Sequence, residues 1–470
     1  MKKKFVLAII SVIFVMIVLL VGTISMGVLS FKSTSSDTTS SQESLQTVVG
    51  NYSDPFISEF NVPNGLPNAI TVDSSGNVWT VLQNSSDLGE FNPTNDSFHE
   101  YPIPGLASKA PLTSWGIAVD NKRGMVWFTE EITNTVWSFQ VQSETFKMYS
   151  IPTLESNPYQ VALDQNGDAW FTEFSGNKIA VVLTNGTVNE FQIPIPSCNP
   201  TGITVDQKTN RVWFNLLDTS GAFDQFYVGS FFNGSFTFNN ITPDVDTPVG
   251  IAVDSSGDVW MTQHGASLVS EFNPVTHYFK TISTSIPSVG ESLPYFVYVD
   301  STTGKIWFNE HYGNAISVFD PNDDTLVEYE IPSRATSDGN ISGALTMALS
   351  PSGTPWFTEL YTGKIGEVNS NLPVGLSINV SKSTIDLGNE SSVPLQLTVT
   401  SSSNATTYLS ASIGNFTGTF DFNFTQYYGS GNYSTTMSVE NGGSPPGVYF
   451  ATISVKSENT IVSQIIEIES

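Results

Sequence analysis

One short phrase recurs seven times along this chain and constrains its fold more than any other feature. Each copy reads as an apolar strand, usually an Asp, a polar turn ending near Gly or Asn, and a second strand centred on Trp. The copies are AITVDSSGNVW, GIAVDNKRGMVW, QVALDQNGDAW, GITVDQKTNRVW, GIAVDSSGDVW, FVYVDSTTGKIW and TMALSPSGTPW. Their tryptophans are Trp79, Trp127, Trp170, Trp213, Trp260, Trp307 and Trp356, separated by 48, 43, 43, 47, 47 and 49 residues. A period in the forties with all-β content is typical of propeller blades. The sequence therefore predicts an all-β, seven-bladed β-propeller.

The repeat region extends over 56–371, and its two ends are out of phase. A typical repeat, the fifth, predicts strands at 249–253, 258–263, 267–272 and 277–282, separated by turns rich in Gly, Asn, Asp and Pro. The last repeat stops after its third strand, whereas an additional fourth strand at 57–62 precedes the first repeat. We expect strand 57–62 to complete blade seven and close the ring, which removes exposed sheet edges.

The C-terminal segment 372–470 lacks the blade phrase and shows short alternating strands instead. About seven or eight strands in a segment of this length are typical of an immunoglobulin-like β-sandwich. The phrase Gly447-Val448-Tyr449 after two prolines is similar to the final hairpin of extracellular immunoglobulin-like modules. We expect this segment to act as a spacer or adhesion module.

The N-terminal segment 1–32 predicts a membrane anchor. Three lysines precede an uncharged apolar run from Phe5 to about Phe31, long enough to cross a hydrocarbon core of about 30 Å. The lysines should remain inside, which places the rest of a single-pass protein outside the cell. A cleaved signal and secretion are the alternative. The Ser/Thr-rich segment 33–55 is expected to be a stalk.

Composition supports an exported protein and narrows its partners. The formal net charge is −27, which repels phosphate backbones and excludes nucleic acid as a partner. Cys198 is the sole cysteine and forms no intrachain disulfide, so we interpret it as a packing residue. Asn-x-Ser/Thr sequons predict surface glycosylation. They lie at Asn51, Asn84, Asn95, Asn185, Asn233, Asn240, Asn340, Asn379, Asn389, Asn404, Asn415, Asn423 and Asn432.

The full repeat resembles a known family. P-x-G-I-x-V-D, G-x-V-W-F-T-E and G-N-K-I, followed by E-F/Y-x-I-P, recur across about residues 56–370 and resemble the streptogramin (virginiamycin) B lyases. The resemblance implies a seven-bladed propeller that opens a cyclic depsipeptide by elimination, with Mg²⁺ and a histidine general base. NHL-repeat propellers, which are interaction modules, share the G-I-A-V-D phrase.

The resemblance also implies where the lyase residues should be, and this chain departs from that pattern. The catalytic histidine should directly follow the Pro that enters a blade's innermost strand. Each of the seven blades has one such position, and none of them is histidine. They hold Asn68, Trp115, Tyr159, Thr201, Val249, Tyr295 and Leu345. A metal-binding Glu should precede that Pro, and the matching residues include Leu66, Asn157, Asn199, Thr247 and Leu293. The missing histidine favours a non-catalytic protein.

A second implied metal-binding Glu lies four residues after a blade Trp, and two of these positions hold histidine. The seven are Gln83, Glu131, Phe174, Leu217, His264, His311 and Leu360. Because blade symmetry places them on one ring, we take His264, His311 and the adjacent Glu310 as candidate catalytic residues. Glu131 and Glu310 are the candidate Mg²⁺ ligands. Alternatively, both histidines are ordinary polar residues at a strand end.

Two further rings complete the candidate site. Trp115, Tyr159 and Tyr295, with Asn68, should face one mouth of the central channel as exposed aromatic and polar groups that bind a ligand. The carboxylates three residues after Trp are interpreted as hydrogen-bond acceptors for backbone or for Asn134, Asn177 or Asn314. They are Glu130, Glu173, Glu310 and Glu359.

The sequence thus predicts a membrane-anchored extracellular propeller that binds a peptide, a glycan or a small cyclic ligand at the channel mouth. The alternative function is a Mg²⁺-dependent carbon–oxygen lyase whose active residues have moved to His264, His311 and Glu310.

Overall fold

The structure is a computed structural model that describes residues 55–106, 112–218, 226–241, 246–284, 291–388, 390, 392–413 and 416–470. These residues belong to one compact unit, Ser53–Ser470. The apolar run 5–31, almost all of the stalk 33–55, and the sequons at Asn51, Asn389 and Asn415 lie outside the described residues. Within the described ranges, no helix has the length and apolarity needed to span a membrane.

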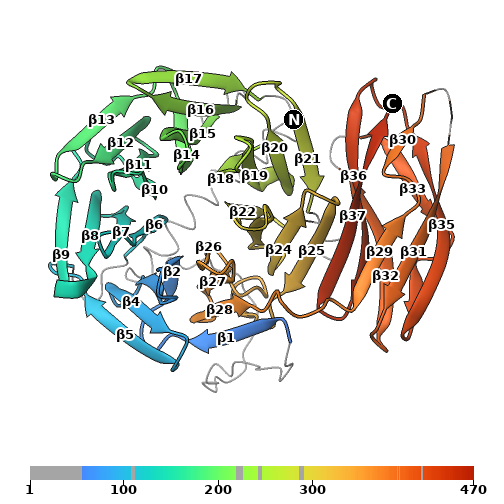
Figure 1. Ribbon diagram of the computed structural model, residues 1–470, viewed down its shortest axis with the longest axis horizontal. Coiled ribbons are helices and arrows are strands. Elements are labelled where there is room, and N and C mark those ends of the chain that lie inside the picture. Colours follow the sequence, from blue (N-terminus) through green and yellow to red (C-terminus); the bar gives the residue numbers. More distant parts are fainter. Residues whose placement is uncertain are drawn as a thin grey trace, which may run out of the picture. The chain divides into compact units, whose positions relative to one another are not determined.

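Seven four-stranded antiparallel sheets follow one another around a central channel (Figure 1). Blades one to three are β2 (Pro67–Val72) to β5 (Ser97–Pro102), β6 (Ile117–Asp120) to β9 (Thr145–Ser150), and β10 (Pro158–Leu163) to β13 (Val188–Gln192). Blades four to six are β14 (Cys198–Asp206) to β17 (Ser235–Asn240), β18 (Pro248–Val253) to β21 (Phe279–Ser283), and β22 (Pro294–Val299) to β25 (Thr325–Glu330). Blade seven contains β26 (Met347–Leu349), β27 (Pro355–Glu359), β28 (Lys364–Val368) and β1 (Ile57–Asn61).

The two ends of the repeat region meet in blade seven. β1 pairs antiparallel with β28, from Ile57 opposite Val368 to Asn61 opposite Lys364, which is the pairing that the sequence predicted. A side-chain contact reinforces this seam, because Lys364 Nζ lies 2.8 Å from Glu59 Oε2. Glu59 also accepts hydrogen bonds from Ser333 N at 2.9 Å and Ser333 Oγ at 2.8 Å, which ties blade seven to the loop that follows blade six.

The repeated Asp and Trp form one local unit within a blade. In blade five, Asp254 Oδ1 accepts hydrogen bonds from the backbone N–H of Ser256 at 2.8 Å and of Asp258 at 3.0 Å. Its other oxygen, Oδ2, accepts from Trp260 Nε1 at 3.1 Å. The Asp therefore caps the turn and fixes the tryptophan, the turn role expected of such residues. The same Asp–Trp bond is present at Asp73 and Asp164.

Neighbouring blades approach each other most closely at the repeated Gly. A Cβ on Gly116 would lie 2.6 Å from Val161 N, and one on Gly202 would lie 2.2 Å from Val249 O. Only glycine allows this approach of two backbones. The Thr two residues after the blade Trp completes the contact: Thr129 Oγ1 donates to Tyr159 O at 2.7 Å, and Thr262 Oγ1 donates to Tyr295 O at 2.7 Å.

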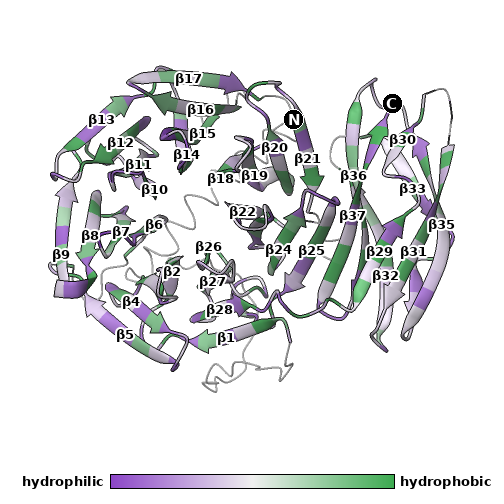
Figure 2. Ribbon diagram, in the orientation of Figure 1, coloured by the Kyte–Doolittle hydropathy of each residue, from purple (hydrophilic) through white to green (hydrophobic). Residues whose placement is uncertain are grey.

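The C-terminal module consists of two sheets. One is β29 (Leu376–Val380), β31 (Ser392–Ser401), β35 (Gly431–Asn441) and β33 (Gly418–Phe422). The other contains β37 (Thr460–Glu469), β36 (Val448–Ser457), β32 (Thr406–Ile413) and β34 (Gln426–Tyr428), with β30 (Thr384–Asp386) parallel to β37. A buried apolar core joins them, and hydrophobic and hydrophilic bands alternate along the strands (Figure 2).

This module is continuous with the propeller through main-chain pairing. β37 pairs antiparallel with β25, the outermost strand of blade six, from Thr325 opposite Gln464 to Tyr329 opposite Thr460. Thr452 Oγ1 donates to Ser283 O in blade five at 2.9 Å. The outer edge of blade six is therefore covered by the module instead of facing solvent, which protects an edge strand.

Candidate functional site

Three aromatic residues from different blades meet at one end of the central channel. Trp115 precedes β6, Tyr159 lies in β10 and Tyr295 lies in β22. The ring centroid of Trp115 lies 5.7 Å from that of Tyr159 and 5.8 Å from that of Tyr295. Tyr159 Oη donates a hydrogen bond to Tyr295 Oη at 2.8 Å. We call these three residues the aromatic plug.

The expectation that these aromatics are exposed is wrong. Trp115, Tyr159 and Tyr295 keep only 6%, 3% and 5% of their surface accessible. The seven innermost strands converge, so side chains at their entry positions pack against one another rather than against solvent. Asn68, at the equivalent position of blade one, is 2% exposed, and its Nδ2 donates to Ser114 O at 2.7 Å. Asn68 therefore bonds a neighbouring loop, and the aromatic plug forms without it.

The two candidate histidines lie against the aromatic plug and against each other. His264 follows β19 (Val259–Gln263), and His311 follows β23 (Ile306–Glu310). Their rings stack with centroids 5.1 Å apart and an interplanar angle of 8°. Both meet Tyr295 edge-on, at 5.2 Å for His264 and 5.7 Å for His311. The structure thus brings together the histidines of blades five and six and three of the four expected ligand-binding residues.

Both imidazoles are neutral at physiological pH. Burial lowers the pKa of His311 to about 4, although its bond to the Leu293 carbonyl raises it. Burial, followed by the charge of His311, holds the pKa of His264 well below its usual value. His311 Nδ1 lies 2.9 Å from Leu293 O, and because a carbonyl only accepts, Nδ1 carries the proton. His311 Nε2 therefore presents a lone pair.

His264 has a polar atom that the described part of the protein leaves without a partner. Its Nε2 is buried and makes no hydrogen bond to any described residue. A buried polar atom of this kind costs free energy, so it is a position where a bound group would be stabilised. This nitrogen belongs to the His264 imidazole, which contacts the side chains of Tyr295 and His311.

Glu131 borders the plug on the side of Trp115. Its Oε2 accepts a hydrogen bond from Trp115 Nε1 at 3.2 Å. Burial raises the pKa of this carboxyl, the Trp115 bond lowers it, and the charge of Glu130 raises it. Glu131 also contributes charge to the surroundings of Tyr159 and Tyr295. The carboxyl group thus gives the site one acidic edge.

Glu310 lies away from the histidine pair, contrary to the prediction that it acts with them. It is fully buried, and its Oε1 accepts a hydrogen bond from Ser317 in β24 (Ala315–Asp320). Its carboxyl also contacts that of Glu328 in β25, and burial raises its pKa to about 7. Successive residues of a strand point to opposite sides, so Glu310 faces the sheet whereas His311 faces the channel mouth.

The donors present do not fit a magnesium site. Within the described residues, no group of three or more His, Cys, Asp or Glu side chains is arranged to hold a metal ion. Mg²⁺ favours near-octahedral oxygen ligation, usually with carboxylates. Glu131 is bonded to Trp115 and Glu310 to Ser317, in different parts of the site.

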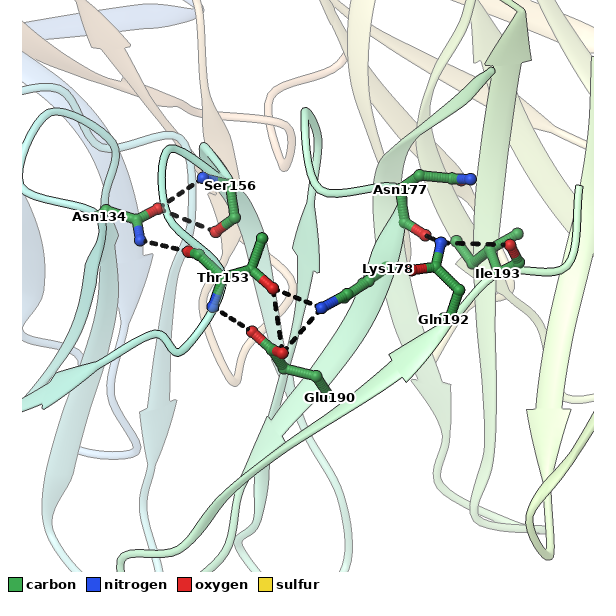
Figure 3. Close-up of polar contacts among 8 residues, drawn as sticks. All are labelled: Asn134, Thr153, Ser156, Asn177, Lys178, Glu190, Gln192 and Ile193. Atoms are coloured by element: carbon green, nitrogen blue, oxygen red, sulfur yellow. Dashed lines mark hydrogen bonds and ion pairs between the residues drawn. The ribbon is translucent and has the colours of Figure 1, made fainter. Parts of the chain in front are cut away.

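Glu130, the carboxylate three residues after Trp127, has backbone hydrogen-bond donors, one of the two kinds of partner that the sequence predicted. Glu130 accepts from the backbone N–H of Ile132 at 3.1 Å and of Thr133 at 2.5 Å, within its own turn. Asn134 instead binds the next loop, where its Oδ1 accepts from Ser156 N at 2.8 Å (Figure 3). In this blade the backbone alternative of the prediction is confirmed, and Asn134 does not serve the carboxylate.

Sequence reasoning missed the partners of the buried carboxylates. Glu190 and Lys178, 2.8 Å apart, hold Thr153 of the preceding loop (Figure 3). The recurring G-x-K-I and E-F-x-I-P phrases carried this signal, because they supply the lysine and the glutamate at equivalent blade positions. In blade six the lysine position holds Ala315.

A cavity of about 390 Å³ is lined by Trp115 and by residues of the innermost strands. Its polar lining includes Gln160, Thr204 and Gln207. A volume of this size is typical of a small-molecule site. The channel mouth therefore combines an aromatic floor, two neutral imidazoles and one carboxyl edge, and the cavity shares Trp115 with it.

Comparison with known proteins agrees with this architecture. Residues 45–223 match the family model of the virginiamycin B lyase family. A solved streptogramin B lyase structure has a TM-score of 0.57 and 23% identity, covering 67% of this chain and 97% of that chain. Selenomethionine-substituted virginiamycin B lyase from Staphylococcus aureus has a TM-score of 0.56 and 24% identity, covering 66% and 98%.

A catalytically inactive variant of the Staphylococcus aureus enzyme, solved with quinupristin, is equally similar, with a TM-score of 0.56 and 23% identity over 66% of this chain and 98% of that chain. No curated protein matches this sequence significantly. Identities at this level show a shared fold. The chain therefore contains a virginiamycin B lyase-like β-propeller.

Proposed function

We propose that this protein is a cell-surface binding protein whose propeller takes a small cyclic peptide or depsipeptide over the aromatic plug and the histidine pair. The observation that carries the proposal is the buried Nε2 of His264, which lies in the ring next to Tyr295 and has no partner in the described part of the chain. A ligand amide or carbonyl group would supply the hydrogen bond that no described residue makes.

The surroundings suit a ligand that is partly apolar. Ile132, directly after Glu131, is 56% exposed, and Tyr312, directly after His311, is 41% exposed. Exposed apolar side chains beside a buried aromatic floor are typical of binding surfaces. A cyclic peptide offers both apolar side chains and backbone amides, and the solved neighbour with quinupristin supports this class.

The cellular setting is part of the proposal. The apolar segment 5–31 would anchor the chain, with Mg²⁺-independent binding taking place outside the cell. Sequon asparagines in the described residues are all exposed, which supports glycosylation. They are Asn84, Asn95, Asn185, Asn233, Asn240, Asn340, Asn379, Asn404, Asn423 and Asn432. The two packed sheets of the C-terminal module support an immunoglobulin-like type.

Titration of the purified full chain with quinupristin tests the binding role. We expect saturable heat of binding, unchanged by EDTA, with recovery of the intact cyclic compound by liquid chromatography and tandem mass spectrometry, which separate it from a linear isomer. His264→Ala should weaken binding at least about tenfold, the equivalent of one lost hydrogen bond or ring contact of about 1.4 kcal/mol. His277→Ala, an exposed histidine in a turn of blade five, is the matched control and should bind like the wild type. Absence of binding would contradict the proposal.

A lyase is the second candidate, favoured by the neutral state of both imidazoles. A neutral imidazole can remove a proton from the carbon adjacent to the one that bears the ester oxygen. The C–H electron pair then forms a carbon–carbon double bond as the carbon–oxygen bond breaks and the carboxylate leaves. The same incubation distinguishes the two functions. A linear product of unchanged mass that disappears with both His264→Ala and His311→Ala would establish the lyase and overturn the binding role.

A further inference from the structure

Three blades contain two glutamates whose carboxyl groups touch; Glu310 and Glu328 form the pair in blade six, and a lysine accompanies each of the other two pairs. Glu173 contacts Glu190 in blade three, and Glu359 contacts Glu59 in blade seven. Glu173 and Glu359 are both 0% exposed. A hydrogen bond between two carboxyl groups requires that one of them keeps its proton. Each pair therefore holds a proton as part of the folded structure.

The blade-three pair is surrounded on each side by defined partners. Glu190 in β13 binds Lys178 Nζ from β12 (Lys178–Val182) at 2.8 Å and Thr153 N from the preceding loop at 2.8 Å (Figure 3). Glu173 in β11 (Ala169–Glu173) faces the same lysine, and neither of its buried oxygens accepts a hydrogen bond from another described residue. The ammonium of Lys178 thus balances the charge of Glu190, and the site carries no excess charge as long as Glu173 keeps its proton.

The blade-seven pair repeats this arrangement at the seam that closes the ring. Lys364 lies 2.8 Å from Glu59 Oε2, and Thr362 Oγ1 donates to Glu359 Oε2 at 2.8 Å. Glu59 belongs to β1, whereas Glu359 and Lys364 belong to β27 and β28. The proton on this pair consequently helps to hold the N-terminal strand in place.

We propose that these two carboxyl pairs are proton-dependent clasps, which make the propeller most stable in mildly acidic surroundings and loosen its closing strand as the pH rises. When a pair loses its proton, two carboxylates share one lysine in a buried site, and the repulsion opposes the strand and loop contacts that Glu59 and Glu190 make. The protein would accordingly work in an acidic extracellular medium.

The direction of the pH dependence follows from the titration of each group. Burial raises the pKa of Glu173 and of Glu359 to about 8, from an ordinary value of 4.5. The folded state then holds more protons than the unfolded state between these values. This contribution to stability is complete below pH 4.5 and is lost as the pH rises through about 8.

Two histidines act in the opposite sense. The pKa values of His264 and His311 are lowered on folding, so their contribution is present above pH 6.5 and is lost as the pH falls, through about 4 for His311. The maximum of stability should therefore lie between about pH 4.5 and 6. Composition agrees, because 44 acidic residues against 17 basic ones leave a net charge of −27 at pH 7, which decreases in acid.

Thermal unfolding of the full chain, followed by tryptophan fluorescence between about pH 4 and pH 9, tests this inference. The wild type should melt several degrees higher at about pH 5 than at about pH 9. Glu173→Gln/Glu359→Gln should lose at least half of that difference, because the amide imitates the protonated carboxyl. Glu155→Gln, an exposed control, should keep it. A melting temperature that is flat or rises toward pH 9, or an unchanged difference in the double variant, would overturn the proposal.

Hydrogen exchange gives an independent measurement that does not need the double variant. After correction for intrinsic rates, amides of β1 and β28 should exchange faster at about pH 8 than at about pH 5, and Glu359→Gln alone should remove that change. Amides of β35 in the C-terminal module are the internal reference. Equal pH responses in β1 and β35 would show that the closing strand has no clasp of its own.

Discussion

The hydroxyl groups of Tyr159 and Tyr295 lie 2.8 Å apart, although 136 positions separate the two residues in the sequence. Tyr159 belongs to blade three and Tyr295 to blade six, so this hydrogen bond crosses the channel mouth. Burial keeps the pKa of Tyr159 well above its usual value, so the hydroxyl retains the proton that it donates. Together with Trp115, the pair closes one end of the ring.

Removing this hydroxyl should destabilise the fold. Tyr159→Phe leaves Tyr295 without its donor in a buried site, at a cost of about 1–2 kcal/mol in the free energy of unfolding. Urea denaturation of the full chain measures this change. Tyr298→Phe is the control, because no hydrogen bond of the Tyr298 hydroxyl is found in the described structure. Equal losses of unfolding free energy in both variants would show that the hydrogen bond between Tyr159 and Tyr295 does not stabilise the fold.

The close contact between blades four and five should tolerate no side chain at Gly202. A Cβ there would lie 2.2 Å from Val249 O and 3.0 Å from Ile251 Cγ2. Gly202→Ala should therefore cost about 2–3 kcal/mol, in the range of overpacked cores, or prevent folding. Gly447→Ala, whose Cβ would meet nothing nearer than 3.7 Å, should leave the melting temperature unchanged. A stable Gly202→Ala protein would show that the two strands can separate.

The Asp–Trp unit predicts a difference between two substitutions at one position. Asp254→Asn keeps an oxygen for the turn N–H groups of Ser256 and Asp258, whereas Asp254→Ala removes every acceptor. We expect a loss of about 2 kcal/mol or more for Ala, and less than half of that for Asn. Chemical denaturation of the two variants checks the order. Equal losses would indicate that the charge, rather than the hydrogen bonds, stabilises the turn.

His311 should make the protein sensitive to acid. Because burial lowers its pKa to about 4, its stabilising contribution is complete above pH 6.5 and decreases as the pH falls toward 4. His311→Gln, which can still donate to Leu293 O but does not titrate, should reduce the loss of stability between about pH 6.5 and pH 4 by up to about 3 kcal/mol. Chemical denaturation at several pH values measures this decrease in the free energy of unfolding. His277→Gln, on an exposed turn, should change nothing.

Local chemistry made much of the site predictable. The equivalent position after each blade Trp placed His264 and His311 on one ring, and the structure stacks their rings at 5.1 Å. The alternation of side chains along a strand already separates Glu310 from His311, and that rule would have corrected the prediction for Glu310. The repeated Lys and Glu of the carboxyl clasps are visible in the sequence, but the role of these residues depends on how deeply Glu173 and Glu359 are buried.

The amino-acid sequence alone determined the blades, their number and the strand that closes the ring, because the period, the turn-capping Asp and the close-contact Gly act within a repeat or between identical neighbours. Only the tertiary structure decided that Trp115, Tyr159 and Tyr295 are buried, that His264 Nε2 has no hydrogen-bond partner among the described residues, and that β37 extends blade six. These features depend on how far the ring converges and on which surfaces meet, and distances between remote residues are set by the packing of the whole ring rather than by any local pattern.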